Sequence, residues 1–165
     1  MAILLDHITD EQVDLIQRSH VFFVASADSS LAEGPDGQGA VNLSPKGAAD
    51  LHVIDRNTLA YFDYSGSGNE TARHAVNGGP VTVMITSFDE DAAIVRLYGW
   101  ARAKPLEESL LSSYAEELRT KEMPTPERQV IEIVVERTQT SCGYGVPIYE
   151  YQGERTVQQR GRRYK

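Results

Sequence analysis

Short runs of β-branched and aromatic residues, separated by turn-forming residues, recur along most of the chain. Each run has the length and composition of a strand, and together they predict strands at residues 21–26, 40–44, 51–54, 58–63, 81–87, 93–104 and 129–138. Most of the connections are short and rich in glycine and polar residues. This arrangement favours a mainly antiparallel sheet rolled into a barrel over a parallel α/β sheet.

Three segments have helical signals instead. Thr9 and Gln12 form a capping box ahead of an amphipathic stretch that ends near Ser19, which predicts a short surface helix. Residues 69–77 predict a second short helix, because glycines and a proline follow it directly. A third helix is expected over residues 105–119, where apolar positions recur at helical spacing: Leu106, Leu110, Leu111, Tyr114 and Leu118.

The length and composition suit one globular domain. With 165 residues, 41% hydrophobic and 24% charged, the chain can bury a core without metals or disulfides. Its net charge of −8 opposes binding to nucleic acid. We expect no membrane span and no secretory signal, since no apolar run is long enough. Cys142 is the single cysteine, which excludes an internal disulfide and favours a reducing cytoplasm.

Charge is distributed unevenly along the chain. Basic residues gather in residues 152–165, which lack an apolar pattern. We therefore expect one domain over residues 1–151 and a basic tail over residues 152–165. The tail is interpreted as a solvated extension, and the alternatives are docking on an acidic partner subunit or weak binding of a polyanion.

A glycine- and serine-rich segment lies between an expected strand and the second expected helix. It reads Ser65, Gly66, Ser67, Gly68, Asn69, Glu70, Thr71 and follows Tyr64. Its glycines let the backbone approach a ligand, and its hydroxyls and helix start offer hydrogen-bond donors to an anion. The spacing matches neither the Walker pattern nor the dinucleotide fingerprint, so phosphate binding and a plain turn with a helix cap both remain open.

Two further segments carry chemical groups. Residues 42–47 end a strand with a hydroxyl, a proline and Lys46, which either neutralises a phosphate or is an exposed turn lysine. Residues 140–147 place small residues around Tyr144, a pattern that suits contact with a flat ligand or another subunit. Burial as a small apolar residue is a commoner role for Cys142 than nucleophilic catalysis. Scattered histidines, without metal-ligand spacing, are expected to be surface or capping residues.

Taken in order, the motifs resemble the pyridoxamine 5'-phosphate oxidase-related flavoproteins. The resemblance covers roughly residues 20–147 and rests on four segments: Asn42-Leu43-Ser44-Pro45-Lys46, Tyr61-Phe62-Asp63 leading into Ser65–Thr71, Arg96-Leu97-Tyr98-Gly99, and Ser141–Pro147. It implies a six-stranded antiparallel split barrel, a homodimer, and flavin mononucleotide (FMN) held at the dimer interface.

The resemblance also implies a set of cofactor-binding residues. Asn42, Ser44 and Lys46 would line the flavin ring and its phosphoribityl chain, with Leu43 and Asp63 beside them. Ser67, Asn69, Glu70 and Thr71 would gather at the phosphate, along with Ser65, Gly66 and Gly68. Glu70 is expected to offer its backbone N–H, because its carboxylate would repel phosphate unless it caps the helix, whereas Lys46 and Arg73 could balance the charge. Residues 141–147 of the partner subunit would cover the ring, with Tyr144 stacking on it and Cys142 nearby.

These features predict an FMN-dependent oxidoreductase acting on a small organic substrate, with no evident catalytic acid or base. The vitamin B6 oxidases themselves carry an arginine- and tryptophan-bearing end, whereas residues 152–165 contain no tryptophan, so oxidation of pyridoxamine phosphate is not expected. Trp100 is expected to be a core or interface residue. The alternatives are a deazaflavin-dependent reductase, which needs a larger and more basic groove, and a flavin-binding or sensing module without turnover.

Overall fold

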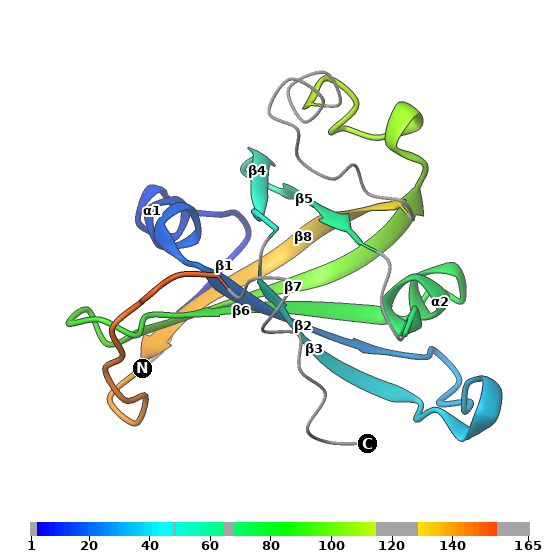
Figure 1. Ribbon diagram of the computed structural model, residues 1–165, viewed down its shortest axis with the longest axis horizontal. Coiled ribbons are helices and arrows are strands. Elements are labelled where there is room, and N and C mark those ends of the chain that lie inside the picture. Colours follow the sequence, from blue (N-terminus) through cyan, green and yellow to red (C-terminus); the bar gives the residue numbers. More distant parts are fainter. Residues whose placement is uncertain (1–2, 48, 65–67, 115–128, 155–165) are drawn as a thin grey trace.

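The computed structural model of the chain describes residues 3–47, 49–64, 68–114 and 129–154. These residues form one antiparallel sheet, two α-helices and two short 3-10 turns (Figure 1). In chain order the elements are β1 (Leu4–Leu5), α1 (Asp10–Arg18), β2 (Val21–Ala27), β3 (Val41–Gly47), β4 (His52–Asp55), β5 (Thr58–Asp63), α2 (Glu70–Val76), β6 (Pro80–Thr86), β7 (Ala93–Lys104) and β8 (Gln129–Cys142). The 3-10 turns span Pro35–Gly37 and Leu106–Glu108.

The strands follow the order β3-β2-β6-β7-β8-β5-β4, and β1 pairs with the far part of β8. All pairs are antiparallel, as the short connections predict. The mainly β split-barrel fold is confirmed, and each of the seven predicted strands is present. The sheet has eight strands, against the six that the resemblance implies. Short β1 and β4 account for the difference, because they extend the sheet beside β8 and β5.

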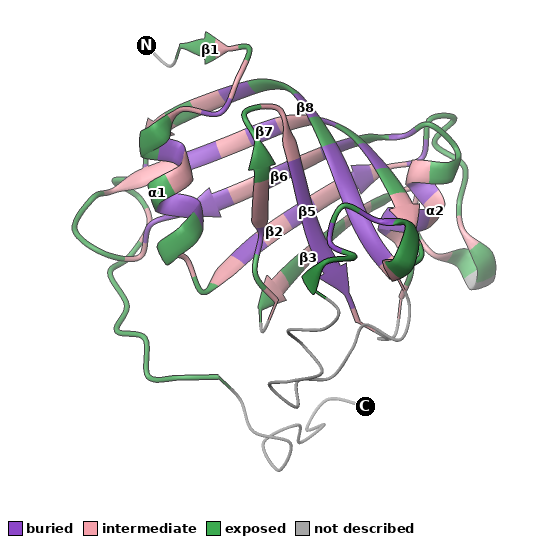
Figure 2. Cartoon of the chain, turned by 90° about the horizontal axis from the view of Figure 1, so that it is seen from above, coloured by how far each residue is buried: buried purple, intermediate pink, exposed green. Residues whose placement is uncertain are grey.

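The first half of β8 lies between two neighbouring strands of the sheet. It pairs with β5 on one side and with β7 on the other, so Ile133 lies between Leu59 and Ala101. Along β2, β6 and β7, buried residues alternate with less buried ones (Figure 2). The buried set points into the barrel and includes Val24, Val83 and Leu97, none of which is exposed at all. This face of the sheet forms the main core, while a second, smaller cluster of Ala60, Phe62, Leu111 and Val130 buries the other face of β5 and the start of β8.

Helix α1 begins as its sequence predicts. The Thr9 hydroxyl accepts a hydrogen bond from the Gln12 backbone N–H at 3.3 Å, and the Gln12 side chain accepts one from the Thr9 N–H at 3.1 Å. The predicted capping box is confirmed. Helix α2 lies at the opposite end of the sheet from α1 in Figure 1 and packs against β2, β6 and β7. No helix within the described ranges is long and apolar enough to cross a lipid bilayer.

The prediction of a helix over residues 105–119 is wrong for its first half. Only Leu106–Glu108 form a 3-10 turn, and residues 110–113 continue as turns. The Ser109 hydroxyl donates to the Leu106 carbonyl at 2.8 Å and accepts from the Leu111 N–H at 3.2 Å, so a side chain competes with the helical backbone bonds. The carboxylate of Glu132 on β8 also accepts the Leu110 N–H at 2.8 Å. Residues 115–119 lie outside the described ranges.

The long β7–β8 pair contains one irregularity, a register shift between Tyr98 and Gly99. A Cβ added at Gly99 would overlap the carbonyl oxygen of Val134 on the neighbouring strand. The backbones approach closely there because residue 99 has no side chain.

We predict that Gly99→Ala lowers the free energy of unfolding by about 2 kcal/mol, because the two strands must separate to admit the methyl group. Urea unfolding followed by circular dichroism measures the change. Gly145→Ala is the matched control, since nothing lies within 4 Å of a Cβ at that position. Equal stability of the two variants would show that the close approach is unimportant.

Candidate functional site

A cavity of about 350 Å³ opens where β3, the end of β5 and the start of α2 meet. We call it the polar cavity. Its lining contains eight of the fourteen cofactor-binding residues that the sequence suggests, brought together from segments far apart in the chain. The lining residues are Asn42, Ser44, Pro45, Lys46, Asp63, Tyr64, Gly68, Asn69, Glu70 and Thr71.

Strand geometry explains the contribution of β3. Side chains alternate between the two faces of a strand, so Asn42, Ser44 and Lys46 share one face and line the cavity together. Asn42 donates from its amide to the Ser44 hydroxyl at 3.0 Å. Leu43 points to the other face, where its side chain is 65% exposed. The alternation therefore places the side chains of Asn42, Ser44 and Lys46 on one face and that of Leu43 on the other.

Lys46 is held in place by an ion pair. Its ammonium lies 3.1 Å from the Asp63 carboxylate at the end of β5, and Asp63 is buried. The same ammonium lies 5.6 Å from the centre of the Tyr61 ring, within range of a cation–π contact. Burial raises the pKa of Tyr61, so the ring remains neutral beneath the cation. Two neighbours thus fix the direction of the Lys46 side chain.

Gln129, which the sequence analysis missed, connects this ion pair to α2. Its amide nitrogen donates to Asp63 at 2.9 Å and to the side-chain oxygen of Asn69 at 2.7 Å. Asp63 and Gln129 are directly paired in the β5–β8 register, which brings them together across 66 positions of sequence. A polar residue at the start of a strongly apolar strand is the one signal that could have identified Gln129.

Helix α2 is anchored through its buried histidine, His74. One ring nitrogen lies 2.9 Å from the Ser26 hydroxyl and the other 3.0 Å from the Arg73 guanidinium. Because a guanidinium only donates, the ring nitrogen facing Arg73 accepts, and the neutral ring carries its proton on the side of Ser26. Burial, and next the charge of Arg73, lower the pKa of His74.

These contacts overturn one expectation, that for His74, and they place the Arg73 side chain outside the polar cavity. His74 is completely buried, whereas a surface or capping role was predicted, because its position on the inner face of α2 directs it toward Ser26 on β2. Arg73 was expected to balance the charge of a phosphate. Its guanidinium instead packs over Gly34 and contacts His74, and Arg73 is not part of the lining of the polar cavity.

Glu70 occupies the start of α2. Its carboxylate folds back onto Gly68, so closely that a Cβ at residue 68 would collide with it. Thr71 beside it is buried and turns toward the cavity. The described wall therefore carries one positive charge, Lys46, and two negative charges, Asp63 and Glu70. The backbone role expected for Glu70 remains a prediction.

The remaining predicted residues lie elsewhere. Cys142 ends β8 and Tyr144 follows it, and neither lines the polar cavity of this chain. Cys142 is exposed, so the expectation of a buried thiol is wrong; the thiol accepts a bond from the Tyr144 N–H at 3.4 Å because the chain turns outward there. Tyr144 is 92% exposed. Ser65, Gly66 and Ser67 lie outside the described residues.

The donor set of the polar cavity determines what it can do. Two amides, two aliphatic hydroxyls, a phenol and an ammonium bind oxygen-rich groups, and the described lining holds no histidine or cysteine. Within the described residues, no group of three His, Cys, Asp or Glu side chains is placed to hold a metal ion. The donor set suits the binding of an oxygen-rich group.

Comparison with known proteins identifies the family. Residues 8–142 match the family model of pyridoxamine 5'-phosphate oxidase, and the chain belongs to this family. It is 32% identical over 152 residues to the pyridoxamine 5'-phosphate oxidase family protein ustO of Aspergillus flavus. That match covers 91% of this chain and only 58% of the fungal protein.

Solved structures share the fold. HupZ of Group A Streptococcus is similar with a TM-score of 0.59 and 24% identity, covering 79% of this chain and 91% of that one. An FMN-binding protein from Syntrophomonas wolfei has a TM-score of 0.52 and 13% identity, covering 78% and 86%. Other chains of known structure therefore share the fold of this protein.

We predict that the folded state loses stability as the pH falls below 6.5, the ordinary pKa of histidine. The lowered pKa means that the unfolded chain takes up a proton at His74 more readily than the folded one, and a protonated ring would also lose its bond from Arg73. Urea midpoints measured between about pH 7 and pH 5 should fall less for His74→Gln than for the unaltered protein. His7→Gln, at a half-buried histidine, is the control; an unchanged pH dependence in His74→Gln would contradict the assignment.

Proposed function

We propose that this protein is an FMN-dependent oxidoreductase that acts on a small organic molecule, with FMN held in the polar cavity. The observation that carries the proposal is the meeting of Asn42, Ser44, Lys46, Asn69 and Thr71 in one cavity. Their contributions come from β3 and from the start of α2. Family membership supports a flavin, and so does the description of the Syntrophomonas wolfei protein as FMN-binding.

The residues present fit the polar part of FMN. Hydroxyl, amide and ammonium groups suit a phosphate and a ribityl chain, and Lys46 supplies the positive charge. Ser65 and Ser67 add hydroxyls to the segment that precedes α2. The carboxylate of Glu70 opposes a phosphate, but Glu70 is only half-buried and can turn outward. Bound FMN would supply the electron transfer, while this chain positions and shields the ring.

Asp63 and Gln129 serve this site indirectly. By pairing with Lys46, Asp63 prevents the ammonium from swinging into solvent, and Gln129 ties the same carboxylate to Asn69. The donors on two elements are thereby held at a fixed separation before a ligand arrives. Such preorganisation lowers the entropic cost of binding.

The charge of the polar cavity favours FMN over a deazaflavin. A deazaflavin with a longer acidic tail needs a strongly basic groove, whereas Lys46 is the only cation in the described lining and already faces Asp63. FMN, with its single phosphate, is the better match. Catalysis is proposed from the family and not from an acid or base in the cavity.

We further propose that two copies associate through the outer face of the sheet. Pro80, Trp100 and Val134 lie side by side on β6, β7 and β8, and the last two are 45% and 47% exposed. On β3, beyond β2, Val41 and Leu43 are also exposed, at 66% and 65%. Contiguous exposed apolar side chains are typical of interfaces. In such a dimer residues 141–147 of one copy are proposed to cover the flavin of the other, with Tyr144 stacking on the ring.

The exposed thiol of Cys142 is relevant to the cellular compartment in which the protein works. It is the only cysteine in the sequence, so it has no partner for an internal disulfide. A free, accessible thiol is compatible with a reducing environment, and we propose the cytoplasm. For the substrate, we propose only its class, a small organic molecule.

We predict that the purified protein binds FMN and that Lys46→Ala and Thr71→Ala each weaken the affinity by about tenfold or more, because each removes a hydrogen bond to a charged group. Quenching of flavin fluorescence on titration measures the affinity. Lys104→Ala is the matched control, because Lys104 also pairs with a buried carboxylate, Glu132 at 3.0 Å, but lies outside the polar cavity.

The proposal fails if FMN binds with the same affinity to all four proteins, or if the unaltered protein does not bind it at all. Reduction of the bound flavin by nicotinamide electron donors then separates an oxidoreductase from a binding or sensing module.

For the dimer, we predict that Leu43→Glu raises the dissociation constant of the two copies by about tenfold or more, since a charge would have to be buried in an apolar contact. Sedimentation equilibrium measures this constant. Ser113→Glu, at an exposed position away from that face, is the control. A monomeric unaltered protein would disprove the interface.

A further inference from the structure

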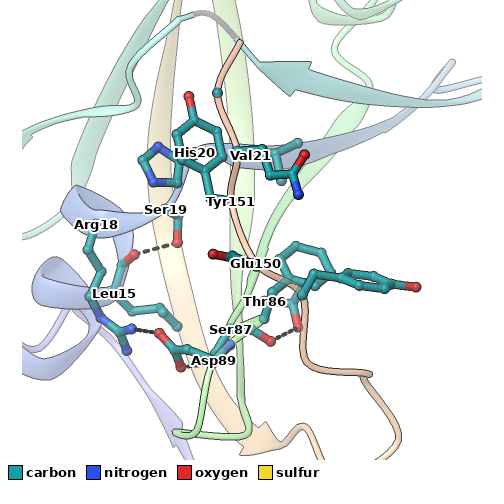
Figure 3. A pocket seen from close by; sticks show the side chains of 14 residues that line it. Leu15, Arg18, Ser19, His20, Val21, Thr86, Ser87, Asp89, Glu150 and Tyr151 are labelled. Atoms are coloured by element: carbon teal, nitrogen blue, oxygen red, sulfur yellow. Dashed lines mark hydrogen bonds and ion pairs between the residues drawn. The ribbon is translucent and has the colours of Figure 1, made fainter. Parts of the chain in front are cut away.

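A second and larger cavity, of about 530 Å³, lies where the end of α1, the start of β2 and the end of β6 meet the segment at residues 149–153 (Figure 3). We call it the aromatic cavity. It shares no lining residue with the polar cavity. The function proposed above makes no use of it.

Aromatic rings form its walls. The His20 and Tyr151 rings stack with their centres 3.5 Å apart and their planes 8° from parallel. The Tyr149 ring lies 5.6 Å from that of Phe88, and the Tyr149 N–H donates to the Phe88 carbonyl at 2.9 Å. The segment at residues 149–153 is therefore held at two points, at His20 and at Phe88. The cavity lies between these two contacts.

The polar groups of this cavity are acidic on balance. Asp89 accepts hydrogen bonds from Ser87 and from Arg18, and Arg18 also pairs with Asp14 and Asp91. Glu150 has no hydrogen bond or ion pair with any described residue. Figure 3 shows its carboxylate in the middle of the lining, between the His20–Tyr151 pair and the Thr86–Ser87 strand end. Among the described residues, the exposed Glu150 carboxylate is thus a negative charge beside aromatic rings that no cation pairs with.

Two hydroxyls complete the lining. Thr86 and Ser87 are 7% and 4% exposed, yet both contribute to the cavity wall. The Thr86 hydroxyl makes only a long bond of 3.4 Å, to the Ser87 carbonyl, and therefore retains capacity to bond a ligand. A ligand that reaches this depth would meet a hydroxyl at its inner end and a carboxylate beside it.

We propose that the aromatic cavity binds a small planar aromatic molecule that carries a protonated amine. The ring faces of Tyr149, Tyr151 and Phe88 offer both apolar contact and cation–π attraction. The carboxylate of Glu150 pairs with the ammonium group, and the same carboxylate repels an acid of equal size. The charge of Glu150 makes the site selective among aromatic molecules of one shape.

Isothermal titration calorimetry of the full chain with tyramine and with 4-hydroxyphenylacetate tests the proposal, because the two compounds share a ring and differ in the sign of their charge. The expected result is that tyramine binds and the acid binds at least about tenfold more weakly. Glu150→Gln should weaken tyramine about fivefold and reduce the difference between the compounds, whereas Tyr151→Ala should weaken tyramine about tenfold. Glu136→Gln, an exposed glutamate on β8, is the control.

The site is independent of the flavin proposal, so Lys46→Ala should leave the affinity for tyramine unchanged while it weakens FMN. Equal binding of the two compounds, no binding of either, or an unaltered affinity in Glu150→Gln would each overturn the proposal. Circular dichroism of every variant verifies that it is folded before titration.

Discussion

The ion pair between Lys46 and Asp63 is the interaction on which the polar cavity depends. It joins β3 to β5, two strands that lie far apart in the strand order, and Gln129 extends it to Asn69 at the start of α2. Without this ion pair, no described side-chain contact would link the donors on β3 to those at the start of α2. The barrel brings the strands close, and this one buried carboxylate fixes the distance between the groups that would hold a ligand.

The same pair limits what the cavity accepts. Asp63 already satisfies Lys46, and Glu70 adds a second carboxylate, so the described wall carries a net charge of −1. A phosphate bound there would add to this negative charge, and an outward turn of the Glu70 side chain would lessen the repulsion. This pairing favours selectivity. An unpaired ammonium would bind any anion, whereas the paired Lys46 ammonium favours a ligand that makes several hydrogen bonds at once.

Much of the fold could be predicted because its signals are local. The capping box of Thr9 and Gln12 lies within one turn, and each strand shows its own run of apolar residues. The failures arise from contacts distant in sequence. The helix expected after residue 105 does not form at its start, because Glu132 and a serine hydroxyl take its backbone N–H groups, and Gln129 meets Asp63 only through a strand register that no local pattern encodes.

For the site, strand alternation placed Asn42, Ser44 and Lys46 on one face, and this much follows from the sequence alone. The direction taken by Arg73 does not, because it depends on the packing of α2. The most direct test of the central claim is a crystal structure grown with FMN. The account predicts the phosphate within hydrogen-bonding distance of Lys46 and Thr71. FMN bound away from β3 and α2, with both side chains left as they are, would contradict it.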